Sequence, residues 1–237
     1  MDGRISIGVR GTLNIAMYEF RRHITAARTY IALFILAFST VAGAYGISLL
    51  TIKPEASIIP EVRPGEEGIF ALYLTSFLTA MIASICALIM GFDAFLKDRV
   101  ENVDDILRSK PISPLGIATG KFLGIFLSLA MPVLALTISS INIINDVTKR
   151  PIPLNVSLWY IFLTLCLIAS MLLIQMIISL LVKNIGSAVM FGVAVWFLYT
   201  VFWLLISLSI AQIMGVNIPR SENVTLEQLE QNEDFLY

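Results

Sequence analysis

The sequence is poor in the residues that soluble proteins and hydrolytic enzymes use. Only 14% of its 237 residues are charged, against about a quarter in a typical soluble domain, and it has a single histidine, His23. Zinc hydrolases need several histidine ligands, and a serine hydrolase needs a histidine beside its nucleophile. His23 lies among arginines, where we expect it to be solvated or lipid-facing, so neither enzyme class is expected. The net charge of −1 gives no reason to expect nucleic-acid binding.

Cysteine is also scarce. Cys86 and Cys166 each lie inside an apolar run and have no CxxC neighbour. This pattern predicts two small buried side chains rather than a metal or redox site. No cofactor and no metal is therefore expected.

Apolar residues are in excess, at 57% of the chain, with a mean hydropathy of +0.85. A helix needs roughly 20 apolar residues to cross the hydrocarbon layer. The apolar runs are continuous rather than alternating, which favours helices over the strands of a barrel. We therefore predict an all-α, polytopic transmembrane bundle that forms one membrane domain over residues 1–237. Its five predicted spans are 29–51, 69–96, 115–144, 158–182 and 187–214.

The distribution of positive charge predicts the orientation. With a cytoplasmic N-terminus, 11 of the 16 lysines and arginines lie on the inner side and 5 on the outer side. Positive residues favour the cytoplasm, so we expect a multi-pass protein of the plasma membrane with its N-terminus inside. The loop 97–114 is then cytoplasmic, and the tail 215–237 lies outside.

The segment 12–28, before the first span, has the pattern of an amphipathic helix. Apolar residues recur there at steps of three and four, and arginines lie largely on another side. Such a helix lies in the headgroup plane, which makes membrane lipid an expected partner. We expect either a generic membrane anchor or an elbow helix that abuts a cytoplasmic partner.

The loop 97–114 contains a short predicted helix. Asn102 suits an N-cap, Asp104 and Asp105 follow in the first turn, and Pro111 ends the helix. A helix of about two turns is marginal in water and needs a surface to pack on. Its apolar residues Ile106 and Leu107, surrounded by charges, are typical of a helix that binds in the groove of a partner protein.

Two runs carry a resemblance to a known family. The run 105–113 reads DILRSKPIS, and the run from Gly120 to Gly124 reads GKFLG. Together with the elbow helix and the order of spans, the two runs resemble the type-2 ABC transporter permeases (the ABC-2 membrane subunit family). Within that family, the sequence is similar to the permeases that accompany nitrous-oxide reductase maturation.

The resemblance implies a permease subunit of an ATP-driven ABC exporter, with ATP hydrolysed by a separate ABC ATPase subunit and no catalytic residue in this chain. It implies a homodimer, or a heterodimer with a related permease. It also implies that the loop residues couple the permease to the ATPase, namely Glu101, Asp104, Asp105, Ile106, Leu107, Arg108, Ser109, Lys110 and Pro111.

Three glycines, Gly116, Gly120 and Gly124, recur every four residues at the start of the third predicted span. They resemble a phosphate loop only superficially, because three residues rather than four separate the first two and Phe122 follows the lysine. We expect them to form a smooth face for helix packing. Elsewhere in the spans, Asp93 is expected to cap or to form an interface near Lys97, and Gln175 to join helices.

One departure keeps a second function open. Members of the family typically have six spans, whereas five are predicted here, so either the product is truncated or split, or another chain supplies the last span. A non-transporting accessory or assembly subunit is the alternative. The substrate stays open, because the span faces carry few polar groups.

Overall fold

The computed structural model describes residues 2–52, 65–100, 113–202, 205–206 and 209. All the regular structure in these ranges is helical, which confirms the predicted all-α class for the part of the chain that is described. The chain divides into two units, Met1–Trp196 and Phe197–Tyr237. The helical bundle lies in the first unit. In the second, a short π-helical turn covers Leu198–Phe202.

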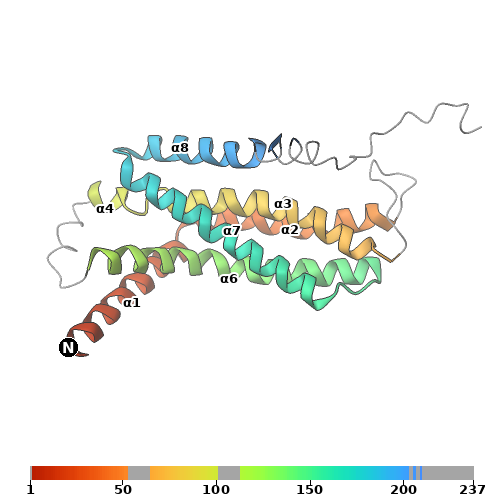
Figure 1. The fold of residues 1–237 in the computed structure, drawn as a ribbon, viewed down its shortest axis with the longest axis horizontal. Helices are drawn as coiled ribbons and strands as arrows, with labels where there is room; N and C mark the ends of the chain where they lie inside the picture. Colours follow the sequence, from red (N-terminus) through yellow and green to blue (C-terminus); the bar gives the residue numbers. More distant parts are fainter. Residues whose placement is uncertain (1, 53–64, 101–112, 203–204, 207–208, 210–237) are drawn as a thin grey trace, which may run out of the picture. The chain divides into compact units, whose positions relative to one another are not determined.

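Figure 1 labels the α-helices of the described residues. They are α1 (Asp2–Ile24), α2 (Ala27–Ile52), α3 (Glu67–Gly91), α4 (Leu96–Val100), α6 (Pro114–Thr148), α7 (Leu154–Leu181) and α8 (Ile185–Phe197).

Four helical segments are long and apolar enough to cross a membrane. They are Ala27–Ile52, Glu67–Arg99, Pro114–Thr148 and Leu154–Leu181, and each contains one of the first four predicted spans or nearly all of it. The fifth predicted span, 187–214, begins within the shorter apolar helix Ile185–Thr200. Its later residues lie largely outside the described ranges, as do most of the loop 97–114 and the whole tail 215–237.

The helix that precedes the first span is longer at its N-terminus than the predicted segment 12–28. It runs from Asp2 to Ile24 and is separated from α2 by a break at Thr25 and Ala26. The Thr25 hydroxyl donates to the carbonyl oxygen of Arg21 at 2.9 Å, which satisfies one of the last carbonyls of α1. The chain can therefore turn there from α1 into the first span.

The start of α6 follows from its sequence. Ser113 has extended backbone, and its hydroxyl accepts a hydrogen bond from the amide of Gly116 at 3.1 Å, while Pro114 takes the first helical position. Serine caps and a proline in the first turn both favour this boundary. The helix ends at Lys149, which adopts a left-handed conformation with φ of 54°.

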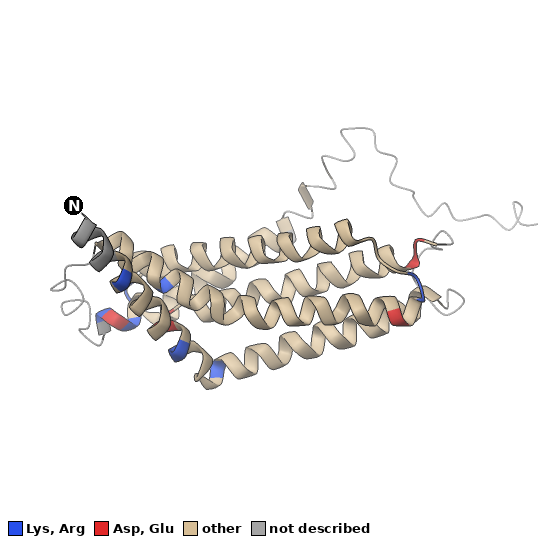
Figure 2. Ribbon diagram, turned by 90° about the horizontal axis from the view of Figure 1, so that it is seen from below, with Lys and Arg blue, Asp and Glu red and all other residues tan. Residues whose placement is uncertain are grey.

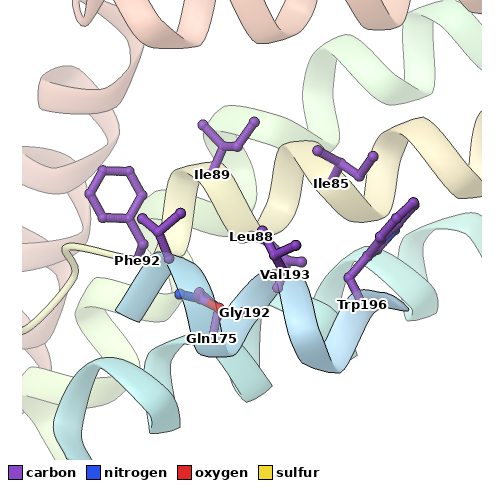
Figure 3. Close-up of a pocket in the computed structure, with 9 residues that line it drawn as sticks. Ile85, Leu88, Ile89, Phe92, Gln175, Gly192, Val193 and Trp196 are labelled. Atoms are coloured by element: carbon purple, nitrogen blue, oxygen red, sulfur yellow. The ribbon is translucent and has the colours of Figure 1, made fainter. Parts of the chain in front are cut away.

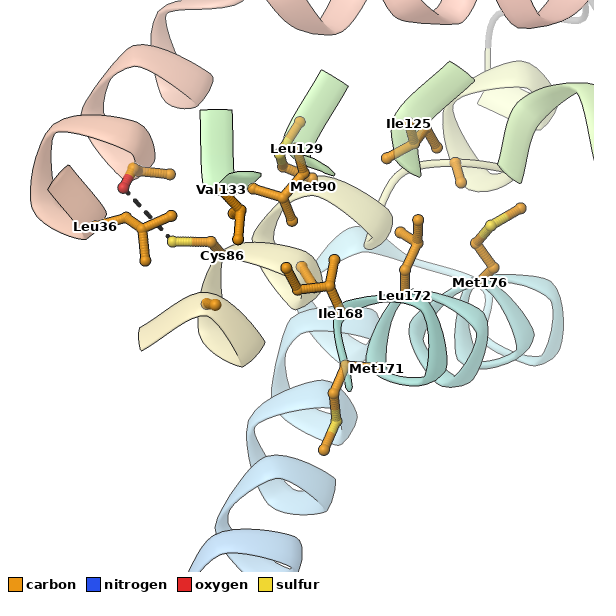
Figure 4. Close-up of a cluster of buried hydrophobic side chains, with 14 residues drawn as sticks. Leu36, Cys86, Met90, Ile125, Leu129, Val133, Ile168, Met171, Leu172 and Met176 are labelled. Carbon is orange, nitrogen blue, oxygen red and sulfur yellow. Dashed lines mark hydrogen bonds between the residues drawn. The ribbon is translucent and has the colours of Figure 1, made fainter. Parts of the chain in front are cut away.

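The core of the unit lies where α2, α3, α6 and α7 pack together (Figure 4). Fully buried side chains from all four helices meet there, among them Leu36, Met90, Leu129 and Ile168. Figure 4 shows Cys86 in the same cluster, donating weakly to the carbonyl of Ala32 at 3.5 Å. Burial of these apolar side chains against one another fixes the four helices as one bundle.

The outer surface of the unit is apolar as well. Large side chains such as Phe34, Phe38 and Trp159 are 71%, 69% and 62% exposed. Figure 2 shows the described charged residues near the two ends of the bundle, with a long uncharged stretch between them. An apolar outer surface between two charged ends is the distribution that a bilayer requires.

One cysteine departs from the expectation. Cys86 is buried as predicted, whereas Cys166 is exposed on α7. The prediction of burial for Cys166 was wrong because an apolar run identifies a span without telling which side of it faces the other helices and which faces lipid.

Candidate functional site

A cluster of charged side chains lies at the end of the bundle where α1, α4 and the start of α6 meet. We call it the charged cluster, and it comprises Glu19, Arg22, Arg28, Asp93, Asp98 and Lys121, with His23 beside them. Its members come from α1, from α2, from the turn after α3, from α4 and from α6. Since three carboxylates face three cations, the charges balance when His23 is neutral.

Lys121 occupies the centre of the cluster although only 1% of it is exposed. Its ammonium nitrogen lies 2.7 Å from Glu19 Oε1, 2.7 Å from Asp98 Oδ2 and 2.8 Å from the carbonyl oxygen of Ala94. An ammonium group has three donors, so each of them has an acceptor. Lys121 therefore links α6 to α1, to the turn before α4 and to α4 itself.

Asp93 forms the second half of the cluster. Arg28 donates to both of its carboxylate oxygens, at 2.8 and 2.9 Å, and Arg22 donates to Oδ2 at 3.3 Å. The guanidinium of Arg28 also lies over the ring of Phe92, 5.0 Å from its centroid. A bidentate arginine–carboxylate pair restricts the relative orientation of its two side chains, so Asp93 holds the end of α3 against α1 and the start of α2. The sequence placed Asp93 at an interface but did not identify the two arginines.

His23 is fully buried, and neither ring nitrogen has a hydrogen-bond partner among the described residues. Glu19 Oε2 lies 3.8 Å from its Nε2. Burial, together with the positive charge of Arg28, lowers the pKa of His23 from 6.5 to about 4. The ring is therefore neutral at pH 7. The prediction of a solvated or lipid-facing histidine was wrong, because this side of α1 packs on other helices instead of facing solvent or lipid.

Two glycines of α6 allow that close packing. A Cβ added at Gly120 would lie 2.7 Å from the carbonyl oxygen of Thr12, and one added at Gly124 would overlap the carbonyl oxygen of Ala16 and lie 2.7 Å from Glu19 Cβ. The backbones of α1 and α6 are thus in direct contact along these two turns. Gly116, one turn earlier, is half-buried.

α4 is also anchored to α7. The hydroxyl of Ser179 accepts from the amides of Phe95 at 3.1 Å and Leu96 at 3.3 Å, and Arg99 donates to the carbonyl oxygen of Leu180 at 2.9 Å. The residues that the sequence assigned to coupling follow α4 directly in the chain. Glu101, Asp104, Asp105, Ile106, Leu107, Arg108, Ser109, Lys110 and Pro111 all lie outside the described residues.

Comparison with known families decides the identity. A sequence model of the family described as ABC-2 family transporter protein matches residues 13–236, which is most of the chain. The chain belongs to the ABC-2 family of transporter proteins. It is therefore a membrane protein and a transport component of the permease type. No curated protein matches it.

In this ABC-2 protein a cavity of about 280 Å³ lies between α3, α7 and α8 (Figure 3). Apart from the amide of Gln175 its lining is apolar, with Phe92 at one end and Trp196 at the other. Gln175 donates to the carbonyl oxygen of Ala188 at 3.0 Å, so it joins α7 to α8 as the sequence predicted. The indole of Trp196 donates to the hydroxyl of Ser84 at 2.8 Å, which ties α8 to α3.

Proposed function

We propose that this ABC-2 protein is the membrane-spanning permease subunit of an ATP-driven exporter, and that a separate ABC ATPase subunit hydrolyses the ATP. The observation that carries the proposal is the attachment of α4. This short helix is bonded to α1 and α6 through Lys121 and to α7 through Ser179, and the chain continues from it into the segment 101–112. A force applied to that segment would therefore reach the spans through a few short, buried contacts.

We propose that the end of the bundle formed by α1 and α4 is cytoplasmic. The excess of lysine and arginine on this side supports the orientation, because positive residues are retained inside. In this orientation Ile106 and Leu107 are available to an ATPase in the cytoplasm, as the coupling residues of the family require. The proposed location is the plasma membrane.

We further propose that two permease chains, either two copies of this one or this one with a relative, enclose the transport path. The glycine face of α6 then serves packing within each chain, since Gly120 and Gly124 contact α1. Export is the direction that the resemblance to type-2 permeases favours.

Affinity purification of the full chain from its native membranes tests the proposal. We expect an ATP-hydrolysing subunit to co-purify, and replacement of both anchors, Ile106→Asp with Leu107→Asp, to remove it. A matched control is Lys149→Asp with Arg150→Asp, which changes charge in the loop at the other end of α6 and should leave the ATPase bound.

Two other outcomes would change the assignment. If the ATPase remains bound when both anchors are replaced, Ile106 and Leu107 are not the coupling site. If only another membrane protein co-purifies and no ATPase is found, the alternative of a non-transporting accessory or assembly subunit is favoured.

A further inference from the structure

Helix α4 is described over Leu96–Val100, and a four-residue turn separates it from the end of α3 at Gly91. The first backbone groups of a helix lack partners within the helix. The position of α4 therefore depends in part on the groups that neighbouring helices supply.

Lys121 contacts α4 and the turn before it at two points. Its ammonium binds the carbonyl oxygen of Ala94, in the turn before α4, and the carboxylate of Asp98, in the first turn of α4. The third donor of the same nitrogen binds Glu19 on α1, which Arg22 in turn contacts at 3.1 Å. One side chain thus joins three elements that are far apart in the sequence.

Stability alone does not account for a buried lysine at this position. Removing charges from water is costly, and an apolar side chain of similar volume often gives equal or greater stability. A buried, fully paired lysine instead specifies one arrangement, since any displacement of α4 or α1 leaves an uncompensated charge. The contacts of Lys121 therefore serve to fix the positions of α1, α4 and α6 relative to one another more than to raise stability.

We infer that Lys121 is a positioning residue that fastens α4 to α1 and α6, so that movement of α4 is transmitted to α1 and to the start of the third span. This inference rests on the proposed function, because it names the residue through which the coupling end of the permease acts. Without the fastening, α4 would keep its contacts with Ser179 and Leu180 on α7 but would lose the link through Lys121 to α1.

The fastening is tested on the full chain alone by hydrogen exchange. Asp98→Ala removes the carboxylate of α4 from Lys121 while alanine keeps a high helix propensity. We expect exchange in peptides that cover α4 to accelerate by roughly tenfold or more, the size of effect that loss of a charge-assisted hydrogen bond produces. Asp146→Ala, the same change near the far end of α6 where the side chain is exposed, is the control and should leave α4 unchanged.

A second variant separates fastening from general loss of stability. Glu19→Ala removes the α1 side of the linkage and leaves both contacts of Lys121 with α4 in place. It should accelerate exchange in α1 and not in α4. If α4 exchanges at the same rate in Asp98→Ala as in the wild type, the inference is overturned. The inference is also overturned if Asp98→Ala and Glu19→Ala accelerate exchange in α4 equally.

Transmission is tested on the complex with its ATPase subunit. In the wild type, addition of ATP should change exchange in α1 and in the first turns of α6. In Asp98→Ala the complex should still hydrolyse ATP, while the change in α1 falls by roughly tenfold or more. Absence of any ATP-dependent change in α1 of the wild type, or an undiminished change in the variant, would refute the role of Lys121. Failure to find an ATPase at all would refute the proposed function and leave the exchange test of the fastening as it stands.

Discussion

The contact between α1 and α6 leads to a sharp prediction for Gly124→Ala. The added methyl group would overlap the carbonyl oxygen of Ala16, lie 2.7 Å from Glu19 Cβ and 3.0 Å from the amide nitrogen of Phe20. Two of these three atoms belong to backbone and cannot rotate away. The helix α1 must therefore move off α6, which lengthens the 2.7 Å contact between Glu19 and Lys121.

The size of the effect follows from two opposing contributions. Overpacking of a close contact costs about 1–3 kcal/mol, whereas alanine in place of glycine inside a helix gains up to about 1 kcal/mol. Gly46 on α2 supplies the matched control, because no neighbouring atom in the described part of the chain lies within 4 Å of a Cβ added there. Only the gain applies to Gly46→Ala, so Gly124→Ala should be less stable than Gly46→Ala by about 1–3 kcal/mol.

The assay is the thermal unfolding midpoint of the two purified variants and the wild type in the same detergent. We expect Gly46→Ala to unfold at or above the wild-type midpoint and Gly124→Ala several degrees below it. Hydrogen exchange in α1 should accelerate only in Gly124→Ala. Equal midpoints for the two alanine variants would refute the close packing of α1 on α6.

Three further predictions concern other contacts. Gly192→Ala places a methyl group against the side-chain oxygen of Gln175 and should accelerate exchange in α8, while Gly186→Ala, whose nearest side-chain atom is 3.7 Å away, should not. The pKa of His23 is about 4 in the folded protein, against 6.5 ordinarily. Between these values the unfolded state binds more protons, so the free energy of unfolding falls as pH drops from 6.5 toward 4, by up to about 1.4 kcal/mol per pH unit. Unfolding midpoints measured across this range should fall less steeply for His23→Leu. Arg28→Lys loses the two-pronged pairing and should lower the midpoint by the equivalent of about 1 kcal/mol, whereas an unchanged midpoint would show that the pairing contributes no stability.

The positions of the spans could be predicted because hydropathy acts locally. A run of about 20 apolar residues can be read without knowing its neighbours, and the first four predicted spans coincide with the four long apolar helices. The cap of α6 at Ser113 is equally local. The side of each helix that faces the others depends on packing, which explains why Cys166 was wrongly expected to be buried.

The charged cluster could not be assembled from the sequence for the same reason. Lys121 and Glu19 are separated by 102 positions, and Arg28 and Asp93 by 65. His23 was expected to be solvated or lipid-facing because its neighbours in the sequence are arginines, yet the fold buries it completely. The sequence held one weak signal of the cluster. Lys121 lies in a predicted span and Glu19 in a basic helix, and burying either charge costs free energy unless the charge is paired.

Binding of an ATPase subunit to the end of the bundle with α1 and α4 can be tested by a photoreactive amino acid at position 107. A second one at position 150, in the loop at the other end of α6, is the comparison. After illumination of native membranes, position 107 should cross-link to an ATP-binding protein and position 150 should not. Cross-linking of an ATP-binding protein from position 150, or from neither position, would show that the ATPase does not bind at the end with α1 and α4.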